Sequence, residues 1–191
     1  MPKAHQRQKR PELVRSQLLA VVRQILVQDG SHAVTLEAVS HRAGVTKGGL
    51  QHHFRSKQAL LDALSDALFD EFGERYVRTL AAEPAGPARH ARAYVRTAFD
   101  EDNGCNQAEM QRAIALLALS QPRCRERWNT LMQALLAEDG ADARAADRLL
   151  LCRLASDGFW FAQMLDVYAI DAARKSRLQA TLLGLCETAV A

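Results

Sequence analysis

Apolar positions recur with the helical period along most of the chain, and no segment shows sustained alternation of β-branched residues. A first stripe lies within residues 11–29, and its members are Val14, Leu18, Val21, Val22, Ile25 and Leu26. A second stripe lies within residues 57–81, and its members are Leu60, Leu61, Leu64, Leu68 and Phe72. Because strands need a period of two, the pattern predicts an all-α protein of about nine helices.

The predicted ends of the first four helices are marked by residues with suitable backbone chemistry. Pro11 suits the first turn of the first helix, and Gly30 suits its end. Gly44 can take the positive φ that ends a short helix closing at Ala43. Hydroxyl side chains that suit N-caps precede the second, third and fourth helices at Thr35, Thr46 and Ser56. A short helix, a Gly turn, a second short helix and a long helix are typical of a helix-turn-helix.

The segment AAEPAGPA at residues 81–88 is the clearest break in the chain. Beyond it, helices are expected over 88–99, over 106–119 after an acidic loop, and from Pro122 to a close at Gly140. A long apolar helix is expected within 141–168, and a last helix capped by Asp171 ends near Ala189. We therefore expect a first domain at 1–56, with 1–9 a disordered basic arm, and a second domain at 57–191, with 57–81 the connecting helix.

Charge is distributed unevenly along the chain, although the net charge is only +3. Residues 1–58 contain ten basic and three acidic side chains, and five of the six histidines. A basic head on an acidic body suggests that the head binds a polyanion. The alternative is a solvated basic tail, because several of these cations lie at the amino terminus.

The predicted third helix, residues 46–53, carries side chains suited to DNA. Lys47 can contact a base or a phosphate, Gln51 can bond adenine in a bidentate way, and His52 and His53 can donate to phosphates or base edges. Gly48 and its neighbour Gly49 cost helicity, and they would let the backbone approach DNA closely. The alternative is a loose turn that is kept short for packing.

Other kinds of chemistry find little support. Adjacent histidines point about 100° apart on a helix, so a metal site at His52 and His53 is not expected. The four cysteines show no CxxC spacing and are expected to be buried thiols, with a redox sensor as the minor alternative. Neither a signal peptide nor an 18-residue uncharged stretch is found, which predicts a cytoplasmic protein without a membrane span. No nucleophile–base pair, paired carboxylates or phosphate loop indicates an enzyme, and no cofactor is predicted.

The body presents two open questions. Its large apolar side chains are either plain core or the lining of a ligand cavity; they are Phe99, Met110, Trp128, Met132, Trp160, Phe161 and Met164. Arg112, Asp157 and Gln163 are polar groups that could orient such a ligand, but no set of ligand-binding residues is predicted. The run from Leu149 to Phe161 is apolar around most of its circumference, which favours a dimer interface with the final helix over a central helix in a monomer.

The segment from Thr35 to Leu64 resembles the DNA-binding domain of the TetR family of transcription regulators. One matching feature is a long first helix that ends at Gly30. The others are Thr35 at the start of the second helix, Ala43-Gly44-Val45 in the turn, and the residues His53-Phe54, Ser56-Lys57 and Leu60. The resemblance implies that His53 and Lys57 touch the DNA backbone, and that Thr35 and Thr46 clamp phosphates. It also implies a homodimeric repressor whose last two helices pair with their mates and whose body binds a small molecule. Gln51 and His52 depart from the family, where one or both positions are commonly Tyr.

The leading hypothesis is a sequence-specific, homodimeric repressor that binds a near-palindromic operator in double-stranded DNA and is released by a small apolar or aromatic effector. The predicted DNA-binding residues are Thr35, Thr46, Lys47, Gly48, Gln51, His52, His53 and Lys57. A protein-binding adaptor and a small helical enzyme without a recognisable motif are the alternatives. Activation rather than repression also stays open.

Overall fold

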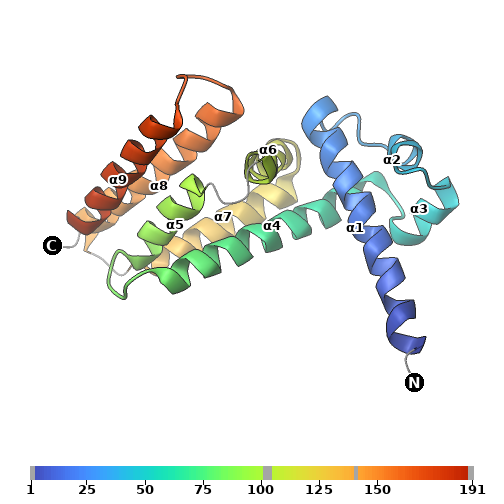
Figure 1. Cartoon of the computed structure of the whole chain (residues 1–191), viewed down its shortest axis with the longest axis horizontal. Helices are drawn as coiled ribbons and strands as arrows, with labels where there is room; N and C mark the ends of the chain where they lie inside the picture. Colours follow the sequence, from blue (N-terminus) through green and yellow to red (C-terminus); the bar gives the residue numbers. More distant parts are fainter. Residues whose placement is uncertain (1–2, 101–104, 140–141, 189–191) are drawn as a thin grey trace. The chain divides into compact units, whose positions relative to one another are not determined.

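The computed structural model describes residues 3–100, 105–139 and 142–188, and within these ranges it contains nine α-helices and no strand (Figure 1). The predicted all-α class is therefore confirmed. The helices are α1 (Lys3–Asp29), α2 (Leu36–Ala43), α3 (Lys47–His53), α4 (Lys57–Ala82), α5 (Arg89–Phe99), α6 (Cys105–Ser120), α7 (Pro122–Ala137), α8 (Ala143–Met164) and α9 (Ala172–Thr188). The predicted close at Gly140 and the acidic residues 101–104 lie outside the described ranges.

The start of α1 differs from the prediction. The helix begins at Lys3 and contains Pro11, whereas the sequence suggested a disordered arm over residues 1–9 and a start near Pro11. Proline removes one backbone donor, but the residues before it include Lys, Arg and Gln, which are strong helix formers. The loss of one hydrogen bond at Pro11 therefore did not justify a helix boundary there.

The described residues divide into two compact units. We call residues 1–69 with 112–125 the N-terminal unit, and residues 70–111 with 126–191 the C-terminal unit. Helix α4 runs along the chain through both units. The domain boundary expected between residues 56 and 57 stays a prediction.

In the N-terminal unit, α2 packs against α1 and α3 packs against α2 (Figure 1). The core of this unit is built from α1, α2, α3, the loop before α2 and the start of α4. Its fully buried members include Leu18, Val22, Ile25, Leu26, Val34, Val39, Leu50, Leu60 and Leu61. Four of the six apolar positions predicted for the first helix are buried, and Val14 and Val21 are half-buried. The short α3 is thus held by tertiary packing, since seven residues cannot form a stable helix alone.

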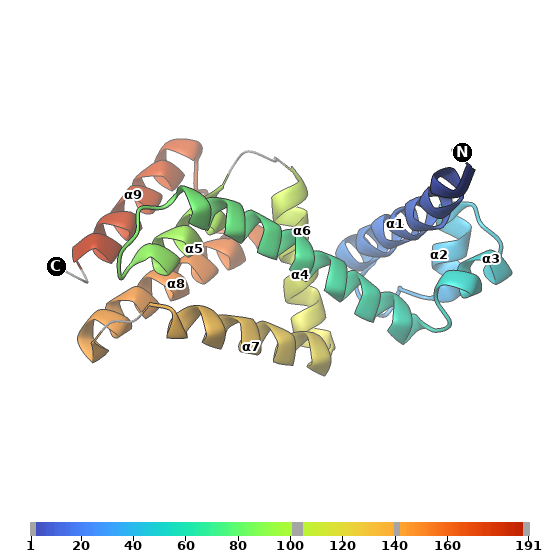
Figure 2. The same cartoon turned by 90° about the horizontal axis from the view of Figure 1, so that it is seen from below.

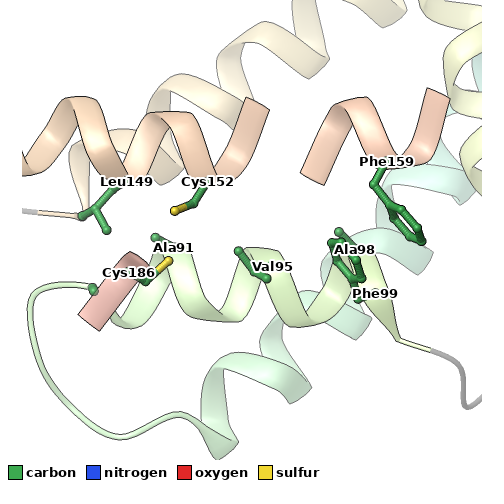
Figure 3. Close-up of a cluster of buried hydrophobic side chains, with 9 residues drawn as sticks. Ala91, Val95, Ala98, Phe99, Leu149, Cys152, Phe159 and Cys186 are labelled. Atoms are coloured by element: carbon green, nitrogen blue, oxygen red, sulfur yellow. The ribbon is translucent and has the colours of Figure 1, made fainter. Parts of the chain in front are cut away.

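In the C-terminal unit, α5 packs against both α8 and α9, and α8 packs against α9 (Figure 2). Small residues on α5, among them Ala91, Val95 and Ala98, let these helices approach closely around the cluster drawn in Figure 3. Phe99 and Phe159 stack there with ring centroids 4.1 Å apart. Asp171 caps α9 as predicted, since its Oδ1 accepts a hydrogen bond from the Arg174 amide at 2.6 Å.

A second aromatic cluster in this unit joins α4, α5, α7 and α8. The Phe72 ring lies 5.4 Å from the Trp128 ring and 6.0 Å from the Trp160 ring, and Tyr94 stacks on Trp160 at 6.2 Å. The Trp160 Nε1 donates to the Ala98 carbonyl at 3.3 Å. These rings pack against one another, so they serve as core, which was the plainer of the two interpretations for Trp128 and Trp160.

Candidate nucleic-acid interface

Helix α3 has one buried side and one exposed side. Leu50 is buried, and so is Phe54, which follows the helix and lies beneath the Arg15 guanidinium at 4.9 Å. Lys47, Gln51 and His52 are all exposed. The helix is therefore anchored through its apolar positions and presents the polar side chains that the sequence singled out.

Two threonine hydroxyls fix the starts of α2 and α3. Thr35 Oγ1 accepts a hydrogen bond from the Ala38 amide at 3.0 Å, and Thr46 Oγ1 accepts one from the Gly49 amide at 3.1 Å. Both caps were predicted, and the turn between the helices takes the predicted positive φ, 66° at Gly44. Both threonines are exposed. A hydroxyl that accepts one hydrogen bond still has its own hydrogen to donate, so each hydroxyl is able to bond a phosphate oxygen as well.

The two glycines of α3 differ in their surroundings. A Cβ atom placed on Gly49 would lie 3.2 Å from Thr46 Oγ1, so this position is constrained by the cap. A Cβ atom placed on Gly48 would meet nothing within 4 Å. The folded protein therefore leaves room for a side chain at Gly48.

His53 and Lys57 have contacts within the protein. The ring of His53 is half-buried and lies 5.6 Å from that of His52. The Lys57 ammonium donates to the carbonyls of Ser31 and His32 at 2.7 and 3.3 Å. Lys57 therefore ties the start of α4 to the turn before α2. These two hydrogen bonds use two of the three N–H groups of its ammonium.

One exposed cation beside α3 was not selected from the sequence. Arg55 lies in the turn between α3 and α4, directly after the buried Phe54. A basic residue in a turn gives no periodic signal, so only its position beside α3 suggests a contact with DNA. In contrast, Arg42 of α2 pairs with Asp29 at 3.3 Å and bonds Gln28, which joins α2 to the end of α1.

A capped short helix, a Gly turn and a second short helix that is anchored by its apolar side define a helix-turn-helix, the class of DNA-binding protein that places its second helix in the major groove. Comparison with known families agrees. Residues 18–64 match the family described as bacterial regulatory proteins, tetR family, and residues 88–187 match the tetracyclin repressor-like C-terminal domain. The chain belongs to the TetR family of transcription regulators.

Relatives and solved structures support the same assignment. The chain is 30% identical over 186 residues to the HTH-type transcriptional regulator BetI of Serratia proteamaculans, which covers 91% of this chain and 90% of that relative. It is 33% identical over 107 residues to BetI of Yersinia pestis, covering 56% of this chain and 54% of the relative. A putative transcriptional regulator from Pseudomonas aeruginosa shares the fold with a TM-score of 0.72, at 18% identity over 94% of this chain and 89% of that one.

These relatives are transcription regulators, so the prediction of a DNA-binding regulator rather than an enzyme is confirmed. Among the residues that the structure describes, no three His, Cys, Asp or Glu side chains come together as a metal site. No helix among them is both long and apolar enough to cross a membrane.

The C-terminal unit contains a buried polar network around Arg153 of α8. Arg153 Nη2 lies 2.9 Å from Asp139 Oδ2 and also donates to the Leu135 carbonyl at 3.1 Å. The guanidinium carbon is 5.1 Å from the Tyr94 ring centroid, and the Tyr94 hydroxyl donates to Asp157. Burial raises the pKa of Asp157, and the Tyr94 hydrogen bond and the Arg153 charge offset this only in part. Burial and the Asp157 carboxylate raise the pKa of Tyr94 well above its usual value.

Of the three polar residues suggested as ligand contacts, Asp157 accepts the hydrogen bond from Tyr94 inside the protein. Arg112 and Gln163 are exposed. The structure instead shows a cleft of about 520 Å³ that is lined by cations from three helices, among them Arg75, Arg96 and Lys175. Sequence reasoning missed this group because its members lie far apart in the chain and none belongs to a motif.

Two cysteines meet between α8 and α9. Cys152 and Cys186 are both buried, and both are labelled in Figure 3. The Cys152 thiol donates to the Leu182 carbonyl at 3.6 Å. The interaction between the two thiols lowers the pKa of Cys152 and raises that of Cys186. Cys124 is also a buried thiol, as expected, and the side chain of Cys105 lies outside the part described.

Helix α8 has an apolar outer face as well as a buried inner one. Leu149, Cys152 and Phe159 face the core. The exposed residues on the opposite side recur every three or four positions; they are Leu151, Leu154, Ala155, Gly158 and Phe161 on α8 and Leu165 directly after it. On α9, Leu178 and Leu185 are exposed. Exposed apolar patches on folded proteins are commonly interaction sites.

Proposed function

We propose that this protein is a homodimeric repressor that binds a near-palindromic DNA site through α3 and leaves it when a small molecule binds the C-terminal unit. The observation that carries the DNA-binding part is the geometry of α3. Its apolar side is buried through Leu50, and its exposed side carries Lys47 and Gln51. Each α3 would enter a major groove, and the two grooves would lie one helical turn apart.

The division of labour among the polar residues follows from their positions. Gln51 offers an amide that bonds adenine through two atoms, so it is proposed as a base-contacting residue, with His52 beside it. Thr35, Thr46 and Lys47 are proposed as phosphate contacts, which supply affinity without sequence information. His53 is proposed to touch the DNA backbone. Lys57 is proposed to do so as well, through the third N–H of its ammonium, since the other two donate to carbonyls.

The dimer is proposed to form through the exposed apolar face of α8 and α9, which is defined by Leu151, Leu154, Phe161, Leu165, Leu178 and Leu185. Pairing two such faces would build a four-helix interface. Ala155 and Gly158 lie on the same face and would allow the helices to approach closely. Two linked heads also explain why a near-palindromic site is expected.

DNA binding is tested on a duplex selected by the protein from a random pool, by titration at several salt concentrations. Gln51→Ala is expected to cost about 1–3 kcal/mol of discrimination at one base position. Lys47→Ala should weaken binding to all duplexes and reduce the salt slope by about one. Gln133→Ala, an exposed glutamine of α7, is the matched control. If both α3 variants behave like this control, α3 does not contact DNA.

The dimer is tested by sedimentation of Leu154→Glu. This side chain is 55% exposed, so the change does not disturb the core of the subunit but places a charge in the proposed interface. Leu119→Glu, at a leucine of α6 that is 74% exposed, is the matched control. We expect Leu154→Glu to be monomeric and to bind its DNA site weakly, and the control to stay dimeric. Dimers in both variants would refute this interface.

An adaptor that kept the helix-turn-helix for structure alone is the competing proposal. Such a protein would show no salt-dependent affinity for DNA, so the titration above separates the two. The exposed Lys47 and Gln51 and the open space at Gly48 favour the regulator, since an adaptor has no use for them.

A further inference from the structure

A cleft of about 520 Å³ lies in the C-terminal unit, where the second half of α4, the end of α5 and the first half of α9 meet (helices labelled in Figure 2). Four cationic side chains and one carboxylate line it, together with one aromatic ring. These residues are Arg75, Arg78, Arg96, Lys175, Asp100 and Phe99. A volume of this size suits a small organic molecule.

Among the residues that the structure describes, the side chains in and beside the cleft carry a net positive charge. Arg75 Nη2 lies 3.1 Å from the Glu71 carboxylate. The buried Glu83 carboxylate accepts hydrogen bonds from Arg96 and, at 2.8 Å, from Arg92 Nε. With Glu71, Glu83 and Arg92 included, this described group contains five cations and three carboxylates, a net charge of +2.

The position of Arg75 strengthens this observation. Its side chain is only 6% exposed, yet it forms part of the cleft wall. A buried guanidinium carries a desolvation penalty, and an anion in the cleft would reduce it by adding charge-assisted hydrogen bonds. Arg78 and Arg96 are more exposed and would attract an anion to the entrance.

The rest of the lining is one aromatic ring, Phe99, and three polar side chains, Thr79, Ser176 and Gln179. Phe99 is buried and stacks on Phe159 with the two planes 8° apart, so this ring of the lining is held in place. The hydroxyl and amide groups can donate further hydrogen bonds to an anionic ligand. A ligand that suits this lining is a small organic molecule with an acidic group.

We propose that this cleft binds a small organic anion, and that this anion is the effector. The effector role rests on the proposed function. Arg75, Arg78 and Thr79 belong to α4, which continues into the N-terminal unit. A ligand that draws this turn of α4 toward α9 therefore acts on a helix that the DNA-binding unit shares, which gives it a route to alter DNA affinity.

The test uses two fluorescent probes of one skeleton, 8-anilinonaphthalene-1-sulfonate and its uncharged parent N-phenyl-1-naphthylamine, titrated into DNA-free, full-length protein. We expect the sulfonate to bind about tenfold more tightly than the parent, because its charge adds hydrogen bonds to cations. It should be displaced by 4-phenylbutyrate and not by 4-phenylbutylamine. Arg78→Gln and Lys175→Gln should each weaken the sulfonate several-fold, whereas Arg144→Gln, an exposed arginine of α8 outside the cleft, should not.

Equal affinity for the two probes, or equal effects of Arg78→Gln and Arg144→Gln, would overturn the anion site. DNA affinity is measured in parallel with and without the sulfonate. DNA binding without any charge preference among the probes would refute the inference alone. If the protein binds the sulfonate more tightly than the uncharged parent but does not bind DNA, the proposed function is refuted and the anion site is supported. Probe binding at the cleft that leaves DNA affinity unchanged would refute the effector role.

Discussion

Short-range hydrogen bonds shape the α2–α3 segment, whereas long-range ones shape the C-terminal unit. Thr35 bonds Ala38 and Thr46 bonds Gly49, each pair being three residues apart in the chain. Tyr94 and Asp157 are separated by 63 residues, and Arg153 lies 14 residues from Asp139. The short-range bonds position exposed side chains, and losing one changes the free energy of unfolding only a little. The long-range bonds hold charged groups inside a core, where the loss of one partner lowers the free energy of unfolding more.

The largest expected effect is that of Asp139→Ala. The substitution leaves the Arg153 guanidinium, 3% exposed, without its carboxylate partner. We expect the free energy of unfolding to fall by about 3–5 kcal/mol, as for other broken buried ion pairs. Urea unfolding measures this, with Asp147→Ala on the exposed side of α8 as the control. A loss below about 1 kcal/mol would show that the network is not a major source of stability.

A smaller loss is expected from Gly44→Ala. Gly44 has a φ of 66°, and a Cβ atom there would meet nothing within 4 Å, so the cost is backbone strain and not a clash. About 1–2 kcal/mol of stability should be lost, as is usual for a side chain in the left-handed region. Thermal unfolding followed by circular dichroism measures it. An unchanged midpoint would mean that the turn relaxes to another conformation.

Gly48→Ala is expected to raise stability and lower DNA affinity at once. Alanine favours the helix by about 1 kcal/mol over glycine, and the protein leaves room for its methyl group. The same methyl group would keep the α3 backbone away from DNA. Unfolding and DNA titration on the same preparation test both halves. A variant that is more stable and binds DNA equally well would mean that Gly48 is not needed for close approach.

The smallest effect is a pH dependence centred on Asp157. Burial raises the pKa of this carboxyl in the folded protein, so the folded state holds the proton more tightly than the unfolded chain does. That stability is complete below the pKa of the unfolded chain and is lost as the pH rises through the raised pKa. Because an asparagine side chain cannot ionise, Asp157→Asn should gain stability relative to the wild type as the pH rises above about 4, the usual pKa of an aspartate in an unfolded chain. Asp147→Asn is the exposed control, and a pH-independent difference for Asp157→Asn would contradict the prediction.

This contrast also explains what could be predicted from the sequence. The caps at Thr35, Thr46, Ser56 and Asp171 and the turn at Gly44 depend on residues a few positions apart, and all of them were predicted correctly. The helical start at Lys3 was missed because a single proline was given more weight than the helix-forming residues before it.

The features of the C-terminal unit could not be predicted in the same way. Arg75, Arg96 and Lys175 share one cleft only because α4, α5 and α9 meet there. The contact between Cys152 and Cys186 likewise depends on the packing of α8 against α9. No local pattern encodes such meetings, so periodicity indicates which faces are buried but not which residues face one another across them.

Recognition of a specific DNA site by α3 in a dimer is tested by capture of genomic DNA fragments with the purified protein at near-physiological salt, followed by sequencing. The Lys47→Ala, Gln51→Ala double variant is run in parallel. We expect enrichment of a near-palindromic site whose half-sites lie one helical turn apart, and loss of this enrichment in the variant. Equal enrichment by both proteins, or none by a folded wild-type dimer, would contradict it.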